Sequence, residues 1–483
     1  MSEIVNLEPR IVWEQFDAVT KVPRPSKKEA KIIDFLVDFA RKHKLEYRKD
    51  ATGNVVMRKG ATPGFEDRPT VILQSHMDMV CEKNSDVEFD FEHDPIRTRI
   101  DGGWVKAEGT TLGADCGIGM AAAMAVMIDP SVEHGPVEAL FTVDEETGLT
   151  GAFGLGEGML TGKYLLNLDS EDEGELFIGC AGGIDTVATF RYTTEAAPAG
   201  AVFFRASVSD LQGGHSGDDI DKGRVNSNKT LARLLWEGMD AFGLRLVTFS
   251  GGNLRNAIPR EASALFCIPA DRQEEFRRYF DRFAAELKEE FCFCEPSFRM
   301  TLAQAEPAAE VVDAVTQRGL VYALVGCPNG VVAMSLAMPG LVETSTNLAS
   351  VKFVEGHRIV VTSSQRSSVE SAKRYVMRSV ESVFRLAGAE VKHSDGYPGW
   401  TPDPSSQLLE KTVAAYERLF STKPKVRAIH AGLECGLFLE KYPELEMVSF
   451  GPTLRGVHSP DERLEIATVS KFWNLLLEVL RTV

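Results

Sequence analysis

The chain has 483 residues, of which 44% are hydrophobic and 25% charged, a composition typical of a soluble globular protein with two or three domains. Lys and Arg total 53 against 70 for Asp and Glu, which gives a formal charge of −17. No basic cluster offsets this charge, so binding to nucleic acid or to anionic membranes is disfavoured, while carboxylates remain available for cations.

The sequence lacks the usual signals for export or membrane insertion. It does not open with a basic stretch and a small-residue cleavage site, and no apolar run reaches the roughly 18 residues needed to span a bilayer. Its eight cysteines are scattered, without a C-x-x-C pair. Such spacing favours reduced thiols over disulfides, so we expect a cytoplasmic protein.

Helices and strands alternate in the first third of the chain. In chain order we predict a helix at 26–44, strands at 54–58 and 70–74, a small-residue helix after Gly117, and strands at 137–145 and 163–169. This alternation is typical of an α/β sheet covered by helices. The fold class predicted for this part is therefore α/β, with a mixed sheet flanked by helices.

The pattern changes after Gly182-Gly183. An α+β insertion is indicated by strands at 190–194 and 202–209 and by helices at 228–237, 273–291 and 368–387. A turn-rich segment near 395–406 follows it. The C-terminal part then contains a helix at 408–420, a strand at 447–451 and a helix at 469–480. The last part is too short to stand alone. We therefore predict a discontinuous catalytic domain of residues 1–185 and 395–483, interrupted by an inserted domain of residues 186–394.

Acidic residues and histidines follow nearly every apolar strand of the predicted sheet. These residues are His76, Asp78, Asp115, Glu145, Glu146, Asp169 and, far downstream, His458. Any one of them alone is more often a structural or surface residue. Their recurrence at strand ends favours a site for a borderline divalent ion such as zinc, cobalt or manganese.

The spacing of these residues suits metal chemistry. Asp78 lies two residues after His76 in an extended segment, so it can hold the imidazole from behind. Glu145 and Glu146 point in different directions, so that one can bind metal while the other holds a water. Asp115 could bridge two ions, and paired ions activate water and stabilise a tetrahedral oxyanion.

Ten short strings carry a resemblance to a known family. They are HMDMV, TLGADCGIGMA, DEETGLTGA, NLDSE, GVHSPDE, IGCAGGID, GGHSGDDI, LRNAIPRE, YPGWTPD and IHAGLECGLF. Together and in order, they resemble the dinuclear zinc exopeptidases that include carboxypeptidase G, aminoacylase and carnosinase. Within this family, the chain is most similar to dipeptidases that cleave Xaa-His substrates.

The resemblance implies a role for each residue at the strand ends. His76 would bind one metal ion with Glu146, His458 would bind the other with Asp169, and Asp115 would bridge the two. Glu145 would be the general base that takes a proton from the attacking water and passes it to the leaving amine. Asp78 would orient His76.

The resemblance also implies substrate contacts and a homodimer. His215 of the inserted domain would reach the active site of a partner subunit and steady the oxyanion. Asn256 and Arg366 would hold the substrate, with Arg366 on its terminal carboxylate, although hydrogen bonding at the domain surface is the alternative for these residues. His430 and Glu434 match the same group, and Glu434 could receive a substrate ammonium or be structural. The inserted domain would act as lid and dimerisation surface.

The predicted activity is metal-dependent hydrolysis of unblocked dipeptides, with C-terminal His favoured but not required. The alternatives are an N-acyl amino acid deacylase on the same scaffold and a metal-binding relative without catalysis. The presence of Glu145 beside a full ligand set argues against the last.

Three features point elsewhere or depart from the family. Gly117, Gly119 and Ala122 fit a nucleotide-binding G-x-G-x-x-A pattern, but no buried strand precedes them, so tight packing beneath the metal loop is the better interpretation. The acidic run 171–173 is expected to be a solvated loop. Cys81 and Cys116 replace residues frequent in relatives, and Cys116 could alter metal preference or sensitivity to oxidation.

Overall fold

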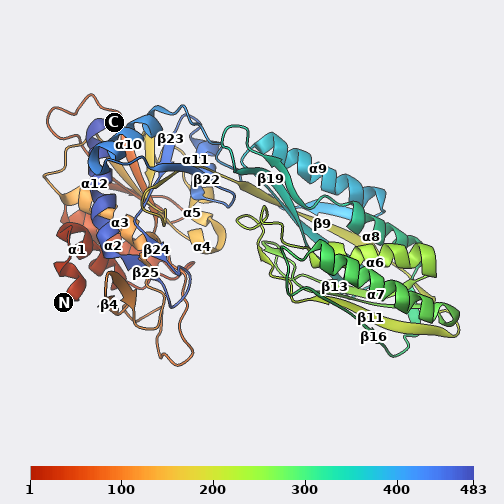
Figure 1. Ribbon diagram of the computed structural model, residues 1–483. Coiled ribbons are helices and arrows are strands. Elements are labelled where there is room, and N and C mark those ends of the chain that lie inside the picture. The colour runs from red at the N-terminus through yellow and green to blue at the C-terminus, as the bar shows by residue number, and fades with distance from the viewer. Residues whose placement is uncertain (1) are drawn as a thin grey trace. The chain divides into compact units, whose positions relative to one another are not determined.

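A computed structural model describes residues 2–483 as two compact units (Figure 1). The first unit comprises residues 2–179, 402–428 and 433–483, and the second comprises residues 180–401 and 429–432. The second unit is longer than the expected insertion at 186–394, because its strand β9 already begins at Gly182 and because four residues near 430 return to it. Gly182 and Gly183, after which the sequence pattern changes, are the first two residues of that strand.

The first unit is built on an eight-stranded mixed sheet. In sheet order its strands are β1 (Glu46–Lys49), β2 (Val55–Lys59), β6 (Val137–Thr142), β3 (Val71–His76), β7 (Tyr164–Asn167), β23 (Glu446–Ser449), β8 (Glu175–Cys180) and β22 (Lys425–Ile429). Strands β6, β3, β7 and β23 run parallel to one another. Parallel strands end at the same edge of a sheet, which makes that edge the natural place for a site.

Helices cover the sheet of the first unit. They are α1 (Arg10–Thr20), α2 (Ala30–Lys42), α3 (Ala114–Ile128), α10 (Gln407–Phe420), α11 (Glu434–Lys441) and α12 (Ile466–Thr482), with the short turns η1 (Glu3–Asn6), α4 (Glu145–Gly148) and α5 (Thr150–Gly154). Helix α3 is buried at every residue from Cys116 to Met127. Its glycines and alanines let both helix α1 and strand β3 pack closely against it.

A small four-stranded sheet belongs to the same unit. Its order is β24 (Leu454–Arg455), β25 (Arg463–Glu465), β5 (Trp104–Ala107) and β4 (Thr98–Asp101). The loop between β24 and β25 carries His458. This sheet therefore brings a C-terminal segment next to a segment from the first quarter of the chain.

The second unit is built on a nine-stranded sheet. Along the sheet lie β16 (Arg299–Gln304), β11 (Ala201–Ser209), β15 (Ala262–Pro269), β13 (Arg245–Gly251), β19 (Val342–Val354), β20 (Arg358–Ser367), β9 (Gly182–Arg191) and β21 (Glu390–His393), and β18 (Gly330–Met334) pairs with β19. All of these pairings are antiparallel. Two short ribbons complete the unit, β10 (Thr194–Ala196) with β17 (Glu310–Val312), and β12 (Gly214–His215) with β14 (Ala257–Ile258).

Four helices pack on the second sheet and form its main core. They are α6 (Ser227–Phe242), α7 (Gln273–Glu290), α8 (Ala314–Gly326) and α9 (Glu370–Leu386), and a short turn, η2 (Ala270–Arg272), precedes α7. The core joins Leu231, Phe276, Leu320 and Val380 from these helices to strand residues such as Phe266. The predicted fold class, a mixed α/β unit together with an α+β unit, is confirmed. Among residues 2–483, no helix is both long and apolar enough to cross a bilayer.

Candidate metal centre

The candidate metal ligands of the first unit lie at or just beyond the ends of its parallel strands. His76 is the last residue of β3, and Asp169 lies two residues beyond β7. Glu145 and Glu146 open α4, three residues beyond the end of β6. Asp115 is the second residue of α3. The sheet edge thus gathers residues that are nearly a hundred positions apart in sequence.

Asp115 lies between the two histidines. The Nε2 atom of His76 is 3.1 Å from Oδ1 of Asp115, and the Nε2 atom of His458 is 3.2 Å from its Oδ2. Each imidazole also contacts a second carboxylate, His76 with Asp169 Oδ1 at 3.3 Å and His458 with Glu146 Oε2 at 3.0 Å. One oxygen of Asp115 thus faces each histidine, as a carboxylate that bridges two ions would require.

The second carboxylate of each histidine differs from the one that the resemblance implied. Asp169, not Glu146, is the ion-pair partner of His76, and Glu146, not Asp169, is the partner of His458. These contacts therefore group the carboxylates differently from the expected pairing, although ligand atoms of His76, Glu145 and Glu146 also lie within 4.8 Å of one another. Strand β3 lies between β6 and β7; Asp169 follows β7 by two residues, whereas Glu146 follows β6 by four and lies in α4, so Asp169 is the carboxylate that comes next to His76. Sheet order is not readable from the strand pattern alone.

Mutual contacts set the proton affinities of these buried groups. Burial disfavours the charged form of His76, yet Asp169 and Asp115 raise its pKa well above the usual value. Hydrogen bonds to Asp115 and Glu146 raise the pKa of His458 to about 11. Burial would raise the pKa of Asp115, but contacts with both histidines hold it well below its usual range. Burial, opposed by His76, raises the pKa of Asp169 to about 6.

Two carboxylate oxygens in this cluster have no hydrogen-bond partner. Glu146 Oε1 and Asp169 Oδ1 are both buried and accept no hydrogen bond, although Asp169 Oδ1 lies 3.3 Å from Nε2 of His76. Buried polar atoms are almost always satisfied, so buried acceptors that lack a hydrogen bond suit a site that binds cations. Ligand atoms of Asp115, Glu146 and His458 lie within 4.8 Å of one another, as do those of His76, Cys116 and Asp169. The donor set of imidazoles and carboxylates therefore fits divalent metal ions.

Asp78 holds both His76 and the segment that carries Glu145. Its Oδ1 lies 3.4 Å from Nδ1 of His76, and its carbonyl oxygen lies 3.2 Å from the same atom. The backbone N–H groups of Glu145 and Glu146 donate to its two carboxylate oxygens at 3.0 and 3.3 Å, and the Ser26 hydroxyl donates at 2.8 Å. Although burial opposes ionisation, the contact with His76 and these donors lower the pKa of Asp78 to about 2. Asp78 is thus a fixed anion behind the imidazole.

Glu145 has a different electrostatic environment. Burial raises its pKa well above the usual value; His76 opposes the rise, and Asp169, Glu434 and Glu146 add to it. A carboxylate with raised proton affinity beside a cation site has the property required of a general base.

Two residues that the sequence pattern did not single out support the cluster. The carboxylate of Glu462, which is 2% exposed, accepts hydrogen bonds from the backbone N–H groups of residues 112–115 at 2.7, 2.9, 2.8 and 3.4 Å. The buried guanidinium of Arg24 donates to the carbonyl oxygen of Asp78 at 2.8 Å and to that of Gly113. Each reads as an ordinary surface charge in sequence, although Glu462 is the last residue of the GVHSPDE string.

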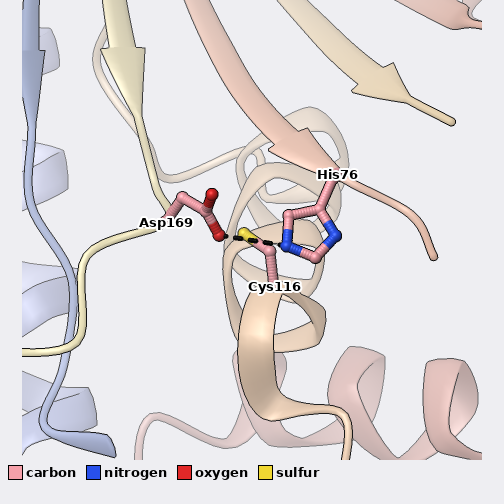
Figure 2. A group of neighbouring side chains, drawn as sticks. All are labelled: His76, Cys116 and Asp169. Carbon is pink, nitrogen blue, oxygen red and sulfur yellow. Dashed lines mark ion pairs between the residues drawn. The ribbon is translucent and has the colours of Figure 1, made fainter. Parts of the chain in front are cut away.

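Cys116 lies beside His76 and Asp169, as Figure 2 shows. Its thiol donates to the carbonyl oxygen of Leu168 at 3.3 Å. Burial, together with Asp169, raises the pKa of Cys116 well above its usual value, which favours the neutral thiol. A Cβ atom at Gly119 would lie 2.5 Å from the Leu168 carbonyl oxygen and 2.6 Å from the sulfur. This supports the interpretation of the glycines as packing residues rather than a nucleotide-binding loop.

Glu434 also belongs to the first unit. It is 2% exposed and opens helix α11. The Gln74 amide and the Thr142 hydroxyl donate to its Oε2 at 2.6 and 2.8 Å, while its Oε1 is buried without a partner. Burial, opposed by His76, raises its pKa to about 8.

Three of the predicted substrate residues cluster in the second unit. Arg366 is 7% exposed; its guanidinium donates to the Tyr397 hydroxyl at 3.2 Å and lies 3.5 Å from Nε2 of His215. His430 Nε2 lies 2.7 Å from the hydroxyl of Ser345. Burial, with Arg366, lowers the pKa of His430 to about 4. Arg366 Nε and His430 Nδ1 are both buried without a partner.

Asn256 and the acidic run occupy other environments. Asn256 is exposed, and its carbonyl oxygen accepts from the backbone N–H of Ser216 at 2.8 Å. Residues 171–173, expected as a solvated loop, are half-buried instead. Burial raises the pKa of Glu171 to about 8, and Asp172 pairs with Arg455 at 2.7 Å. Residues 171–173 come just after Asp169 in the chain. Strand β7, which positions Asp169, therefore also places these acidic residues in a half-buried environment.

Comparisons with known proteins agree with this geometry. Residues 72–482 match the model of peptidase family M20/M25/M40. The cytosol non-specific dipeptidase of Escherichia coli K12 is 42% identical over 487 residues, which cover 100% of this chain and 99% of that protein.

Solved structures agree as well. The crystal structure of an aminoacylhistidine dipeptidase from Vibrio alginolyticus is 45% identical, with a TM-score of 0.95, over 100% of this chain and 98% of that one. An aminopeptidase from Bacillus cereus is only 16% identical, with a TM-score of 0.60 over 99% of each chain, and shares the fold alone. The resemblance identified from the sequence is thereby confirmed, and the chain belongs to peptidase family M20/M25/M40.

Proposed function

We propose that this chain is a dipeptidase that hydrolyses unblocked dipeptides with the help of two divalent metal ions. One observation carries the proposal: Asp115 presents one carboxylate oxygen to each of two histidines, and Glu145, with raised proton affinity, lies in the same cluster. The names of the Escherichia coli and Vibrio alginolyticus relatives support dipeptides as the substrate class.

The contacts suggest how the ligands divide between two ions. His76 and Asp169 would hold one ion, His458 and Glu146 the other, and Asp115 would contribute an oxygen to each. Zinc suits this donor set, and cobalt or manganese are alternatives. Bound ions of this kind polarise the scissile carbonyl and lower the pKa of a water.

Glu145 would move the protons of the reaction. Its carboxylate would accept a proton from the attacking water and then deliver it to the amine of the leaving amino acid. The two backbone N–H bonds to Asp78 fix the start of α4, so that the carboxylate keeps its position during both transfers. Asp78 would also hold His76 in one orientation.

The second unit would supply contacts to the substrate. Arg366 presents an unpaired Nε donor, which suits the terminal carboxylate of a dipeptide, and His430 presents an unpaired Nδ1. His215 would steady the oxyanion from a partner subunit, and Asn256 would hold the peptide. In the first unit, the unpaired Oε1 of Glu434 would receive the substrate ammonium.

We further propose a homodimer in which residues 186–394 act as lid and dimerisation surface. C-terminal His would be favoured without being required, in line with one relative named for aminoacylhistidine and another named non-specific. A cytoplasmic location fits the word cytosol in the name of the latter.

A substrate panel tests the proposed function. Purified protein loaded with zinc, cobalt or manganese is assayed on Ala-His, β-Ala-His, other dipeptides and N-acetylated amino acids, with metal stoichiometry measured in parallel. We expect cleavage of free dipeptides by protein with two ions per chain. In Glu145→Gln, turnover should fall by about 10²- to 10⁴-fold with metal content unchanged. Cleavage of N-acyl amino acids alone would indicate a deacylase, and binding of metal without any hydrolysis would refute catalysis.

A further inference from the structure

A row of buried polar side chains crosses three parallel strands, two residues before the candidate ligands His76 and Asp169. Gln74 on β3 pairs in register with Asn167 on β7, and Asn167 pairs in register with Ser449 on β23. Gln74 precedes His76 by two residues, and Asn167 precedes Asp169 by two. Each of the three polar residues is at most 1% exposed.

Hydrogen bonds join this row from strand to strand. The Asn167 amide donates to Gln74 Oε1 at 2.5 Å, and the Ser449 hydroxyl donates to Asn167 Oδ1 at 2.5 Å. At one end, the Gln74 amide donates to Glu434 Oε2 at 2.6 Å. At the other, Ser449 shares a hydrogen bond with the Ser170 hydroxyl at 2.7 Å. The row thus spans three neighbouring strands and ends beside Asp169.

The fold itself does not require polar residues at these positions. Parallel strands buried on both faces are normally continuous apolar runs, as VIL of β3 and YLL of β7 are here. Burying an amide costs free energy unless its hydrogen bonds are made, and a mispaired register would leave both amides unsatisfied. Side-chain bonds across the row therefore favour one register of β3 against β7, and with it one spacing of the residues that follow.

We propose that Gln74 and Asn167 are positioning residues that set the distance between His76 and Asp169, and thereby the affinity of the ion that these two residues would share. The inference rests on the proposed function for the existence of that ion. Neither amide touches the ion or the substrate; both act through the strand ends. Gln74 is central, since its oxygen accepts from Asn167 while its nitrogen donates to Glu434.

A second buried glutamine provides a matched control. Gln365 on β20 of the second unit is 0% exposed and also joins neighbouring strands. The Thr186 hydroxyl of β9 donates to its oxygen at 2.7 Å, and its amide donates to the Thr346 hydroxyl of β19 at 3.3 Å. Gln365→Met therefore removes a comparable set of bonds, in a sheet that carries none of the metal ligands.

The test compares Gln74→Met, Asn167→Leu, the double variant and Gln365→Met. For each protein, affinities for zinc and cobalt are measured by competition with a chelator, the visible spectrum of the cobalt form is recorded, and unfolding of the ion-free protein is followed. We expect Gln74→Met and Asn167→Leu to lower the affinity for one of the two ions by about 10-fold or more and to change the visible spectrum of the cobalt form. Because Gln74 and Asn167 share one hydrogen bond, the double variant should lose less binding free energy for the ion than the two single variants lose in sum. Gln365→Met should bind both ions as the wild type does.

Three outcomes would overturn the inference. Gln74→Met could bind both ions with wild-type affinity and an unchanged cobalt spectrum, its loss could match that of Gln365→Met, or the losses in the double variant could simply add. If Gln74→Met does not fold, Ser449→Ala breaks the same row more gently and is judged by the same measurements. Failure of the proposed function is distinguishable, since the wild type itself would then bind no ion pair or cleave no dipeptide.

Discussion

At the candidate site residues, the two units leave opposite kinds of buried polar atom without a hydrogen bond. In the first unit the unpaired atoms at the candidate site are acceptors, the carboxylate oxygens of Glu146, Asp169 and Glu434. In the second unit, Arg366 and His430 leave ring or guanidinium nitrogens unpaired. Unpaired acceptors suit a cation, and unpaired donors suit an anion or a carbonyl oxygen. The difference supports the proposal that the metal ions bind to the first unit, whereas the second unit, together with Glu434 of the first, contacts the substrate.

The strongest test of this division is Asp115→Asn. Among residues 2–483, Asp115 is the one carboxylate that contacts both imidazoles, so loss of its charge should lower the affinity for both ions. Metal content should fall below two ions per chain, and hydrolysis should fall by about 10³-fold, since bound metal supplies several kcal/mol of transition-state stabilisation. Elemental analysis and a dipeptide assay measure the two effects.

Asp101→Asn serves as the control for Asp115→Asn. Asp101 pairs with Lys106 at 2.7 Å in the small sheet of the same unit and is exposed. This variant should keep both ions and full activity. Retention of two tightly bound ions by Asp115→Asn would show that the carboxylate is not shared.

Arg366→Met examines the other side of the comparison. Loss of the guanidinium should lower kcat/KM for dipeptides by about 100-fold, as expected when a charged hydrogen bond to a carboxylate is removed. Metal content should remain that of the wild type, because Arg366 lies in the unit without the ligands. A loss of metal in this variant would contradict the division of roles between the units.

Two buried glutamates that cap backbone N–H groups sharpen the comparison further. Glu462 accepts four such bonds in the loop before Asp115, and Glu295 of the second unit accepts two, from Gln212 at 2.8 Å and Val225 at 3.2 Å. Both Glu462→Ala and Glu295→Ala should destabilise the protein by about 2–4 kcal/mol, because buried donors are left unsatisfied. Only Glu462→Ala should also weaken metal binding, by about 10-fold. Urea unfolding and chelator competition separate the effects, and equal metal affinities in the two variants would refute a specific role for Glu462.

The sequence predicted the first unit better than the second for a physical reason. Four candidate ligands, His76, Glu145, Glu146 and Asp169, end or follow short apolar strands, so a change from apolar to polar residues marks them, as in TVILQSH and LLNLD. His215, Arg366 and His430 occupy strands or turns that mix polar and apolar residues, and β19 and β20, with their many Ser and Thr residues, do not read as buried strands. Residues 429–432 are separated from the rest of their unit by other elements, so no local pattern could assign them.

Contacts that depend on tertiary structure were also beyond the sequence. Glu462 and Arg24 are buried by partners far along the chain, and the contact between Asp169 and His76 depends on the parallel pairing of β7 with β3. A resemblance supplied the set of site residues, but the geometry was needed to pair them.

The most direct contrast between the units is in pH dependence. Burial lowers the pKa of His430 from 6.5 to about 4, and burial raises the pKa of Glu434 from 4.5 to about 8. The contribution of neutral His430 is fully present above pH 6.5 and is lost as the pH falls through 4. The contribution of protonated Glu434 is fully present below pH 4.5 and is lost as the pH rises through 8.

In protein without bound ions, both His430→Gln and Glu434→Gln should therefore reduce the pH dependence of the free energy of unfolding. The reduction should lie on the acidic side for His430→Gln and on the alkaline side for Glu434→Gln. In His430→Gln, the decline between pH 6.5 and 4 should shrink by on the order of 3 kcal/mol, and in Glu434→Gln the decline between pH 4.5 and 8 should shrink instead. Urea unfolding at intervals across this range measures both. Each group stabilises its unit only in its uncharged form. If both variants reduce the pH dependence of unfolding over the same pH range, the assignment of a neutral imidazole to His430 and a protonated carboxyl to Glu434 is wrong.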